Sequence, residues 1–99
     1  MRLMRFLDKE DKKIKYCTSD NGSNFLIDGD IFSNFEVTNI EANISKILSP
    51  LNPTSILCIG LNYKKHAEEG NVPIPEYPVL FMKQPSSIQN PSDPIILPK

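Results

Sequence analysis

His66 is the only histidine in this chain of 99 residues, and it lies in a stretch, Ile56–Lys83, that holds most of the side chains suited to acid–base chemistry. Tyr63, His66 and Glu69 are spaced three apart, so on a helix they would share one face. A carboxylate one turn from an imidazole orients the ring and raises its basicity, and histidine gains and loses a proton near neutral pH. The spacing predicts a His66–Glu69 proton-transfer pair, with an ordinary surface histidine as the alternative.

Lys83 directly follows a second apolar run at the end of the same stretch. Its ammonium group is a compact positive charge that could bind the carboxylate of a substrate. The alternative is a solvated lysine at the end of a strand.

A helix is expected over Tyr63–Glu69, with Asn62 as its N-cap and Gly70 as its C′ residue. Its two lysine–glutamate pairs place the base before the acid, which is the less favourable order on a helix. The lysines also lie near the positive end of the helix dipole, and the glutamates near its negative end. A helix this short is marginal without packing. We therefore expect a segment that becomes ordered when a ligand docks on it, as catalytic lids do.

The chain contains nine prolines and only short apolar runs, which favours a mainly β fold, a β-rich α+β class with few helices. Residues 1–37 are expected to form a small β-meander, with Asp28-Gly29 as a tight hairpin turn. Asn39–Leu48 is ambiguous between a weak helix and an extended connector, because its isoleucines recur at helical spacing. The strands expected in the meander are Arg2–Leu7, Ile14–Cys17 and Phe25–Ile27, and the turns are Asp8–Lys13 and Thr18–Asn24.

Pro50 and Pro53 mark the expected boundary between two domains, because each removes a backbone donor and disfavours helix before it. Residues 1–51 would be a small N-terminal β subdomain, followed by a second domain at 52–99. The second domain is expected to contain buried strands at Ile56–Ile59 and Val79–Met82, an irregular loop at Val72–Pro78 and a last short strand at Ile95–Leu97.

A formal net charge of −1 argues against a sequence-independent nucleic-acid binder, which needs a basic surface. The basic run from Lys12 to Lys15 is flanked by acidic residues, which indicates a solvated turn. Cys17 and Cys58 lack zinc-site spacing, so both are expected to be structural, with Cys58 buried. No run is as long as a membrane span, and Met1–Leu7 lacks the features of a signal peptide. A soluble cytoplasmic protein with reduced thiols is therefore expected.

Three segments in order, CIGLNYKKHAEE, PVLFMKQPSS and DPIILP, resemble the fumarylacetoacetate hydrolase family. The shared pattern is a strand ending in glycine, Asn-Tyr-x-x-His with a glutamate three residues later, Pro-Val-Leu-Phe-x-Lys, and a closing Pro-Ile-x-Leu-Pro. The resemblance covers Ile56–Pro98. It extends more loosely to Met1–Leu51, which is similar to a small N-terminal domain often fused ahead of this fold.

The resemblance implies a β-rich roll that binds Mg²⁺ or Mn²⁺ and acts on 2-oxo or diketo acids. The reactions it implies are C–C bond hydrolysis, isomerisation and decarboxylation, commonly in a homodimer. By position, His66 would be the general base and Glu69 its orienting carboxylate. Lys83 would line the active site, and Tyr63 would contact the substrate. The family's metal ligands, a Glu-x-Glu pair and a later aspartate, have no match here, and Asp93 is a lone carboxylate.

We therefore expect the N-terminal portion of such an enzyme, ending before the metal ligands. Alone it would bind no metal, be inactive and fold poorly, because its strands lack partners. Three alternatives stay open. They are a non-catalytic remnant or pseudo-enzyme that pairs with a full-length relative, the product of an interrupted gene, and an unrelated small β-domain binding module. Leu61 leaves the substrate preference open, because some relatives carry a polar or basic residue there.

Overall fold

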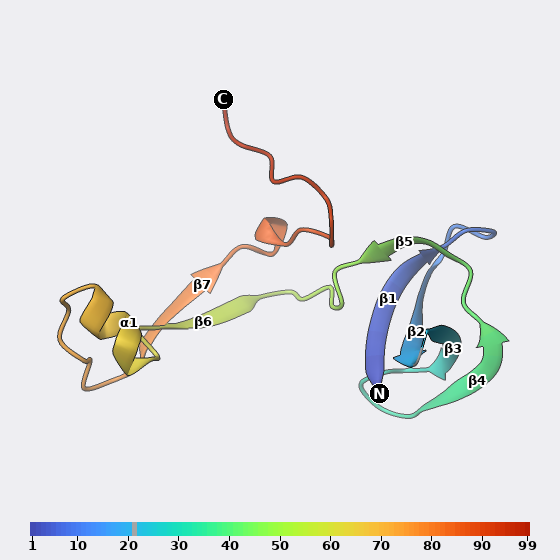
Figure 1. The fold of residues 1–99 in the computed structure, drawn as a ribbon, viewed down its shortest axis with the longest axis horizontal. Coiled ribbons are helices and arrows are strands. Elements are labelled where there is room, and N and C mark those ends of the chain that lie inside the picture. Colours follow the sequence, from blue (N-terminus) through green and yellow to red (C-terminus); the bar gives the residue numbers. More distant parts are fainter. Residues whose placement is uncertain (21) are drawn as a thin grey trace. The chain divides into compact units, whose positions relative to one another are not determined.

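The computed structural model describes residues 1–20 and 22–99. The chain divides into two compact units, one formed by residues 1–51 together with 89–99 and the other by residues 52–88 (Figure 1). Each unit has its own sheet, so each is considered by itself. The two-domain division predicted from the prolines stays a prediction.

The first unit is built on an antiparallel sheet whose strand order, among the described residues, is β4-β3-β2-β1-β5. The mainly β fold class is confirmed at this level. The strands are β1 (Arg2–Asp8), β2 (Ile14–Asp20), β3 (Ser23–Gly29), β4 (Phe35–Glu41) and β5 (Ile44–Leu48). Of the predicted strands, the first matches β1, whereas β2 and β3 extend into the predicted turn at Thr18–Asn24. Asn21, inside that predicted turn, lies outside the described residues.

The sheet curls because its two edge strands, β4 and β5, are joined by only Ala42 and Asn43. The N–H of Ala42 donates to the carbonyl of Asn24 at 2.8 Å, and the N–H of Lys9 donates to the carbonyl of Asn43 at 2.9 Å. The strand register also shifts on both sides of this corner, in the β3–β4 and the β1–β5 pairs. Such irregularities bend a strand and increase its twist, so a short turn can connect the two edge strands.

Asn39–Leu48 therefore forms strand on both sides of the corner, and the helix considered for it is wrong. Its helical spacing comes from isoleucines, which are β-branched and favour a pleated surface once neighbouring strands are available. The predicted hairpin at Asp28-Gly29 exists, but its tight turn does not. Gly29 pairs with Phe35, which leaves a longer loop between them. Gly29 has a φ of 101°, and a Cβ there would overlap the carbonyl oxygen of Asn34, so the position requires glycine.

Phe6 and Cys17 are fully buried and form the centre of the small core. Cys17 is opposite Met4, two residues from Phe6 on β1, so the two buried side chains lie on the same face of the sheet. Burial raises the pKa of the Cys17 thiol, because the thiolate would lose its hydration. This agrees with a structural cysteine.

Asp8 closes the turn between β1 and β2. Its Oδ1 accepts hydrogen bonds from the N–H groups of Glu10 at 2.8 Å and Asp11 at 3.3 Å, and its Oδ2 lies 3.1 Å from the Nζ of Lys15. The N–H of Glu10 and then the ammonium group of Lys15 lower the pKa of the Asp8 carboxyl. The turn predicted here is confirmed, but it is not simply solvated, because Asp8 is only 5% exposed.

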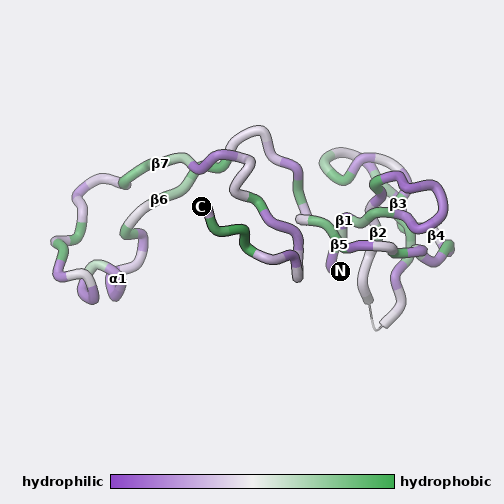
Figure 2. Tube along the Cα trace, turned by 90° about the horizontal axis from the view of Figure 1, so that it is seen from above, coloured by the Kyte–Doolittle hydropathy of each residue, from purple (hydrophilic) through white to green (hydrophobic). Residues whose placement is uncertain are grey.

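The second unit is a hairpin of β6 (Ile56–Gly60) and β7 (Val79–Lys83), with α1 (Lys64–Glu69) and a short 3-10 turn, η1 (Pro85–Ser87), along its chain. Both strands were predicted as buried, and this is wrong in the described structure. Leu57 and Leu80 are each 64% exposed, and Cys58 is only half-buried. Each strand has just one partner here, although hydropathy is high along both (Figure 2). Much of the apolar surface of both strands is therefore exposed in the described structure.

Ile95–Leu97, predicted as a last strand, is not a strand in the described structure, and its side chains are exposed. A strand requires a neighbour for its backbone hydrogen bonds, and this segment has none among the described residues. The predicted irregular loop at Val72–Pro78 is confirmed. Among the residues described, no helix has the length and apolar character needed to cross a membrane.

Helix α1 ends in a Schellman motif that was not foreseen. The N–H of Asn71 donates to the carbonyl of Glu68 at 3.1 Å, and the N–H of Val72 donates to the carbonyl of Ala67 at 3.0 Å. The left-handed residue of this motif is Asn71, with a φ of 50°, whereas Gly70 has a φ of −84°. The prediction of Gly70 as the C′ residue is therefore wrong by one position, since asparagine also tolerates the left-handed conformation.

Asp8→Asn should lower the stability of the first unit. Because folding lowers the pKa of Asp8 from 3.8, its carboxylate stabilises the fold above that value and loses this effect as the pH falls below it. We expect the melting temperature at about pH 7 to fall by a few degrees. The difference from the parent chain should shrink from about pH 5 to about pH 2. Circular dichroism measures both. Asp28→Asn, at an exposed position of β3, is the control, and an equal loss in both variants would contradict this role for Asp8.

Substitution of Asn71 tests the end of α1. A β-branched residue is strained in the left-handed conformation, so Asn71→Val should break the motif and make the Val72 amide exchange roughly tenfold faster, whereas Asn71→Gly should preserve its protection. Amide hydrogen exchange measures this. Equal exchange rates in the two variants would show that the left-handed residue does not hold the helix end.

Candidate functional site

Tyr63, His66 and Glu69 lie on one short segment, with Tyr63 as the N-cap residue of α1 and the other two inside the helix. The carbonyl of Tyr63 accepts hydrogen bonds from the N–H groups of His66 at 3.0 Å and Ala67 at 3.3 Å. Asn62 was predicted as the N-cap, which is wrong. The backbone turns into the helix one residue later, at an extended Tyr63.

The orientation of α1 is set by Ala67, which is buried, while Tyr63, His66 and Glu69 are all exposed. In the described structure, the His66 imidazole and the Glu69 carboxylate share a face but are not hydrogen-bonded to each other. Both side chains are therefore accessible from solvent in the described structure. The catalytic roles of these residues stay predictions.

The charges on α1 do little to hold it. The Nζ of Lys64 lies 3.9 Å from the Oε1 of Glu68, and both side chains are well exposed. Such pairs contribute little to stability. No acidic residue lies in the first turn of the helix, and Tyr63 makes no side-chain cap there. His66 lies in the last turn, where a protonated imidazole interacts favourably with the helix dipole.

Lys83 does not lie near His66 along the hairpin. It pairs with Ile56, whereas Gly60, from which the chain leads into α1, pairs with Val79. Four residue steps on a strand separate these pairs, a distance of roughly 13 Å. In the described structure Lys83 is an exposed residue at the end of the hairpin remote from the helix.

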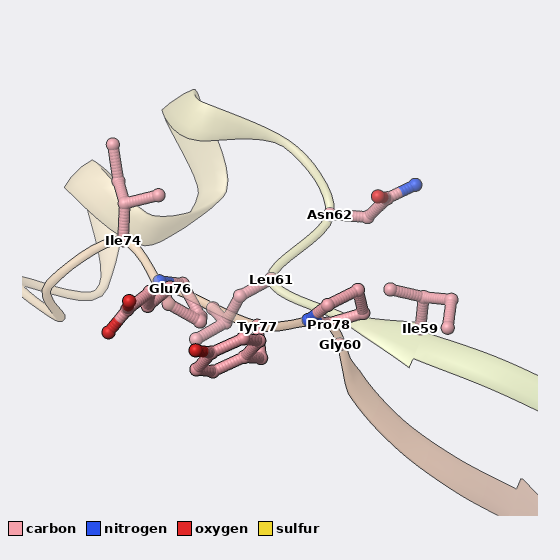
Figure 3. A pocket seen from close by; sticks show the side chains of 9 residues that line it. Ile59, Gly60, Leu61, Asn62, Ile74, Glu76, Tyr77 and Pro78 are labelled. Carbon is pink, nitrogen blue, oxygen red and sulfur yellow. The ribbon is translucent and has the colours of Figure 1, made fainter.

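A hollow of about 270 Å³ lies at the other end of the hairpin, beside the loop that follows the helix (Figure 3). Its lining comes from the end of β6, the turn after it and the proline-rich loop. Leu61 lines it with a φ of 49°, an uncommon conformation for a leucine. Glu76 and Tyr77 are polar lining residues that the sequence interpretation missed. The only signal was their position between prolines just before a strand.

The described residues contain no group of three or more histidine, cysteine or carboxylate side chains placed to hold a metal ion. Asp93 belongs to the first unit, where the Nζ of Lys46 lies 2.7 Å from its carboxylate. The ammonium group of Lys46, followed by the amide of Asn90, lowers the pKa of the Asp93 carboxyl. These residues do not fit a divalent cation, which needs several converging oxygen ligands.

Comparison with known proteins finds relatives of this chain, and the family match lies in its second half. Residues 55–99 match the family described as "Fumarylacetoacetate (FAA) hydrolase C-terminal". A mitochondrial oxaloacetate tautomerase of Xenopus laevis is 50% identical over 58 residues, which are 59% of this chain and 18% of that protein. No solved structure matches the chain.

Two further relatives differ in how much of the chain they cover. An uncharacterised protein of Archaeoglobus fulgidus is 44% identical over 77 residues, which are 76% of this chain and 30% of the relative. A 2,4-didehydro-3-deoxy-L-rhamnonate hydrolase of a Sphingomonas species is 54% identical over 44 residues, 44% of this chain and 15% of that enzyme. The chain therefore spans between about a seventh and a third of the length of these relatives. Residues 55–99, the segment that carries Tyr63, His66 and Glu69, are therefore similar to the fumarylacetoacetate hydrolase family.

Proposed function

We propose that this chain is part of an enzyme that moves a proton on a 2-oxo or diketo acid, with His66 as the general base. One observation carries the proposal: the segment that matches the family places its histidine and a glutamate on the same exposed face of α1. Keto–enol isomerisation is the favoured reaction, because it needs only proton transfer and the Xenopus relative is named an oxaloacetate tautomerase. C–C bond hydrolysis is the second candidate, since the Sphingomonas relative is named a hydrolase.

In this mechanism the neutral imidazole of His66 takes a proton from the carbon beside the substrate carbonyl, or from water in a hydrolysis. The Glu69 carboxylate orients the ring and stabilises the imidazolium that forms. The helix dipole adds to this stabilisation, because His66 lies in the last turn of α1. Tyr63, at the start of the helix, would contact the substrate, and Lys83 would bind a carboxylate only if the hairpin and the helix fold toward each other.

We propose a divalent cation, Mg²⁺ or Mn²⁺, only for a complete enzyme, because the described residues do not form a site for one. Bound beside an oxo acid, such a cation would polarise the carbonyl. Because the carboxylates of the described residues do not converge on one point, the proton-transfer steps are assigned to His66 and Glu69 alone.

We further propose that the 99-residue chain is inactive by itself. A lone two-stranded hairpin is at best marginally stable in water, and β6 and β7 expose apolar side chains on both faces. The same exposed surface supports a non-catalytic alternative, in which the chain pairs with a full-length relative or with another copy of itself. Co-purification with such a relative, without restored activity, would favour that alternative.

The 99-residue chain, supplied with oxaloacetate or an acylpyruvate and Mg²⁺, should show no turnover above the uncatalysed rate. Spectrophotometry of the enol absorbance measures tautomerisation, and product analysis measures cleavage. Metal-dependent turnover by the isolated chain would contradict the proposal that it is inactive alone.

The roles of His66 and Glu69 are testable in a chimera in which residues 55–99 replace the matching segment of the Xenopus tautomerase. His66→Gln should lower kcat by roughly 10²- to 10⁴-fold, because the general base is lost. Glu69→Gln should lower it less, since the base remains but its orientation and its imidazolium are less stabilised.

Glu68→Gln is the matched control for Glu69→Gln, because it removes an exposed carboxylate from the same helix and should leave kcat unchanged. If His66→Gln retains the parent rate and pH profile while Glu68→Gln and Glu69→Gln behave alike, α1 does not carry the proton-transfer groups.

A further inference from the structure

A turn at Asn90–Asp93 belongs to the first unit, although it lies far along the chain from the strands of that unit. The N–H of Asp93 donates to the carbonyl of Asn90 at 3.2 Å. Pro91 and Ser92 are the two central residues, and Ser92 has a φ of 65°. Proline followed by a residue with positive φ is the pattern of a type II turn, in which glycine is usual at the second central position.

This turn contacts the end of β5. The N–H of Ser49, directly after β5, donates to the Oδ1 of Asn90 at 2.9 Å. The Nζ of Lys46, within β5, donates to the Oδ2 of Asp93 at 2.7 Å. The Nδ2 of Asn90 also donates to the Oδ2 of Asp93, at 3.1 Å. The three contacts form one connected network between segments more than 40 residues apart in sequence.

The network supplies a hydrogen-bond acceptor for the backbone N–H of Ser49, for which the sheet provides none. β5 is an edge strand of the described sheet, so its outward backbone groups have no neighbouring strand. Ser49 is only 8% exposed, and a buried N–H without a partner destabilises a fold. Asn90 supplies that partner. On the other side, the Nη1 of Arg5 donates to the carbonyl of Ser49 at 3.4 Å, which ties the same residue to β1.

The contact between the Lys46 ammonium group and the Asp93 carboxylate is short, and the same carboxylate also accepts a hydrogen bond from Asn90. A hydrogen bond between an ammonium and a carboxylate is stronger than one between neutral groups. The Asp93 carboxylate is partly covered and accepts from both Lys46 and Asn90. The strain at Ser92 supports the same interpretation, because a residue other than glycine keeps a positive φ only where its surroundings hold it there.

We propose that the Asn90–Asp93 turn is a latch that fastens the end of the family segment to the N-terminal sheet, with Lys46 and Ser49 as its receptor. The family match ends in residues 89–99, whereas the sheet lies outside that match. The latch therefore joins the segment that the family model matches to a sheet that lies outside that match. Asp93 is assigned a structural role in this joint, independent of the proposed function.

The test uses the full 99-residue chain and follows amide exchange at Ser49 together with backbone chemical shifts of residues 89–99. Asn90→Ala should speed exchange at Ser49 roughly tenfold, because its acceptor is removed. Lys46→Met and Asp93→Asn should each move the shifts of residues 89–99. The double variant should move them no further than the larger single change, because both remove one contact.

Lys65→Met and Glu36→Gln are matched controls, because they remove an exposed lysine and an exposed carboxylate from other elements. Protection of the Phe6 and Cys17 amides reports whether the sheet stays folded in each variant. If a single change unfolds the sheet, the charge exchange Lys46→Asp with Asp93→Lys should restore both the fold and the shifts. Unchanged Ser49 exchange in Asn90→Ala, additive effects of Lys46→Met and Asp93→Asn, or failure of the charge exchange would each overturn the latch.

Discussion

Backbone N–H and C=O groups in a strand need partners, and this requirement governs both units of the chain. In the first unit, β1 pairs with β2 on one side and with β5 on the other, and Phe6 on β1 is fully buried. In the second unit, β6 and β7 pair with each other and with no other described strand. The first unit therefore has a five-stranded sheet, whereas the hairpin that leads to the candidate catalytic helix has no further strand at either edge among the described residues and exposes much of its apolar surface.

The candidate site depends on that hairpin. β6 delivers the chain to α1, and the proline-rich loop returns it to β7, with the Schellman motif at Asn71 setting where the helix stops. Only Ala67 anchors the helix by burial, so His66 and Glu69 point outward. Catalytic lids are commonly held by few buried contacts, and the role of α1 as a lid that a ligand completes stays a prediction.

The sequence predicted the elements whose signals are local. The spacing of Tyr63, His66 and Glu69 located the helix to within a residue, and the turn chemistry around Asp8 located the first β-hairpin. The family segment was also identified correctly. Signals that depend on distant partners failed. Asn39–Leu48 had a helical pattern but became strand beside β1 and β3, and Ile95–Leu97 had a strand composition but no described neighbour.

Burial was the hardest property to predict from the sequence. An apolar run shows that its residues favour burial, but it does not show which segment will cover them. Ile56–Ile59 has the composition of a buried strand and is half-exposed here. The contacts of Lys46 with Asp93 and of Ser49 with Asn90 had no sequence signal, since neither pair is close in the chain or part of a motif. The left-handed conformations of Leu61 and Asn71 were also not predicted, because neither residue is a glycine.

The most direct test of the central claim is deuterium uptake from D₂O into the carbon beside the substrate carbonyl, followed by NMR in the chimera that carries residues 55–99. If His66 moves that proton, uptake should be catalysed in the parent chimera and should fall by roughly 10²- to 10⁴-fold in His66→Gln, with Glu68→Gln unaffected. Uptake at the parent rate in His66→Gln would contradict the account, because the proton would then be moved by a group other than His66.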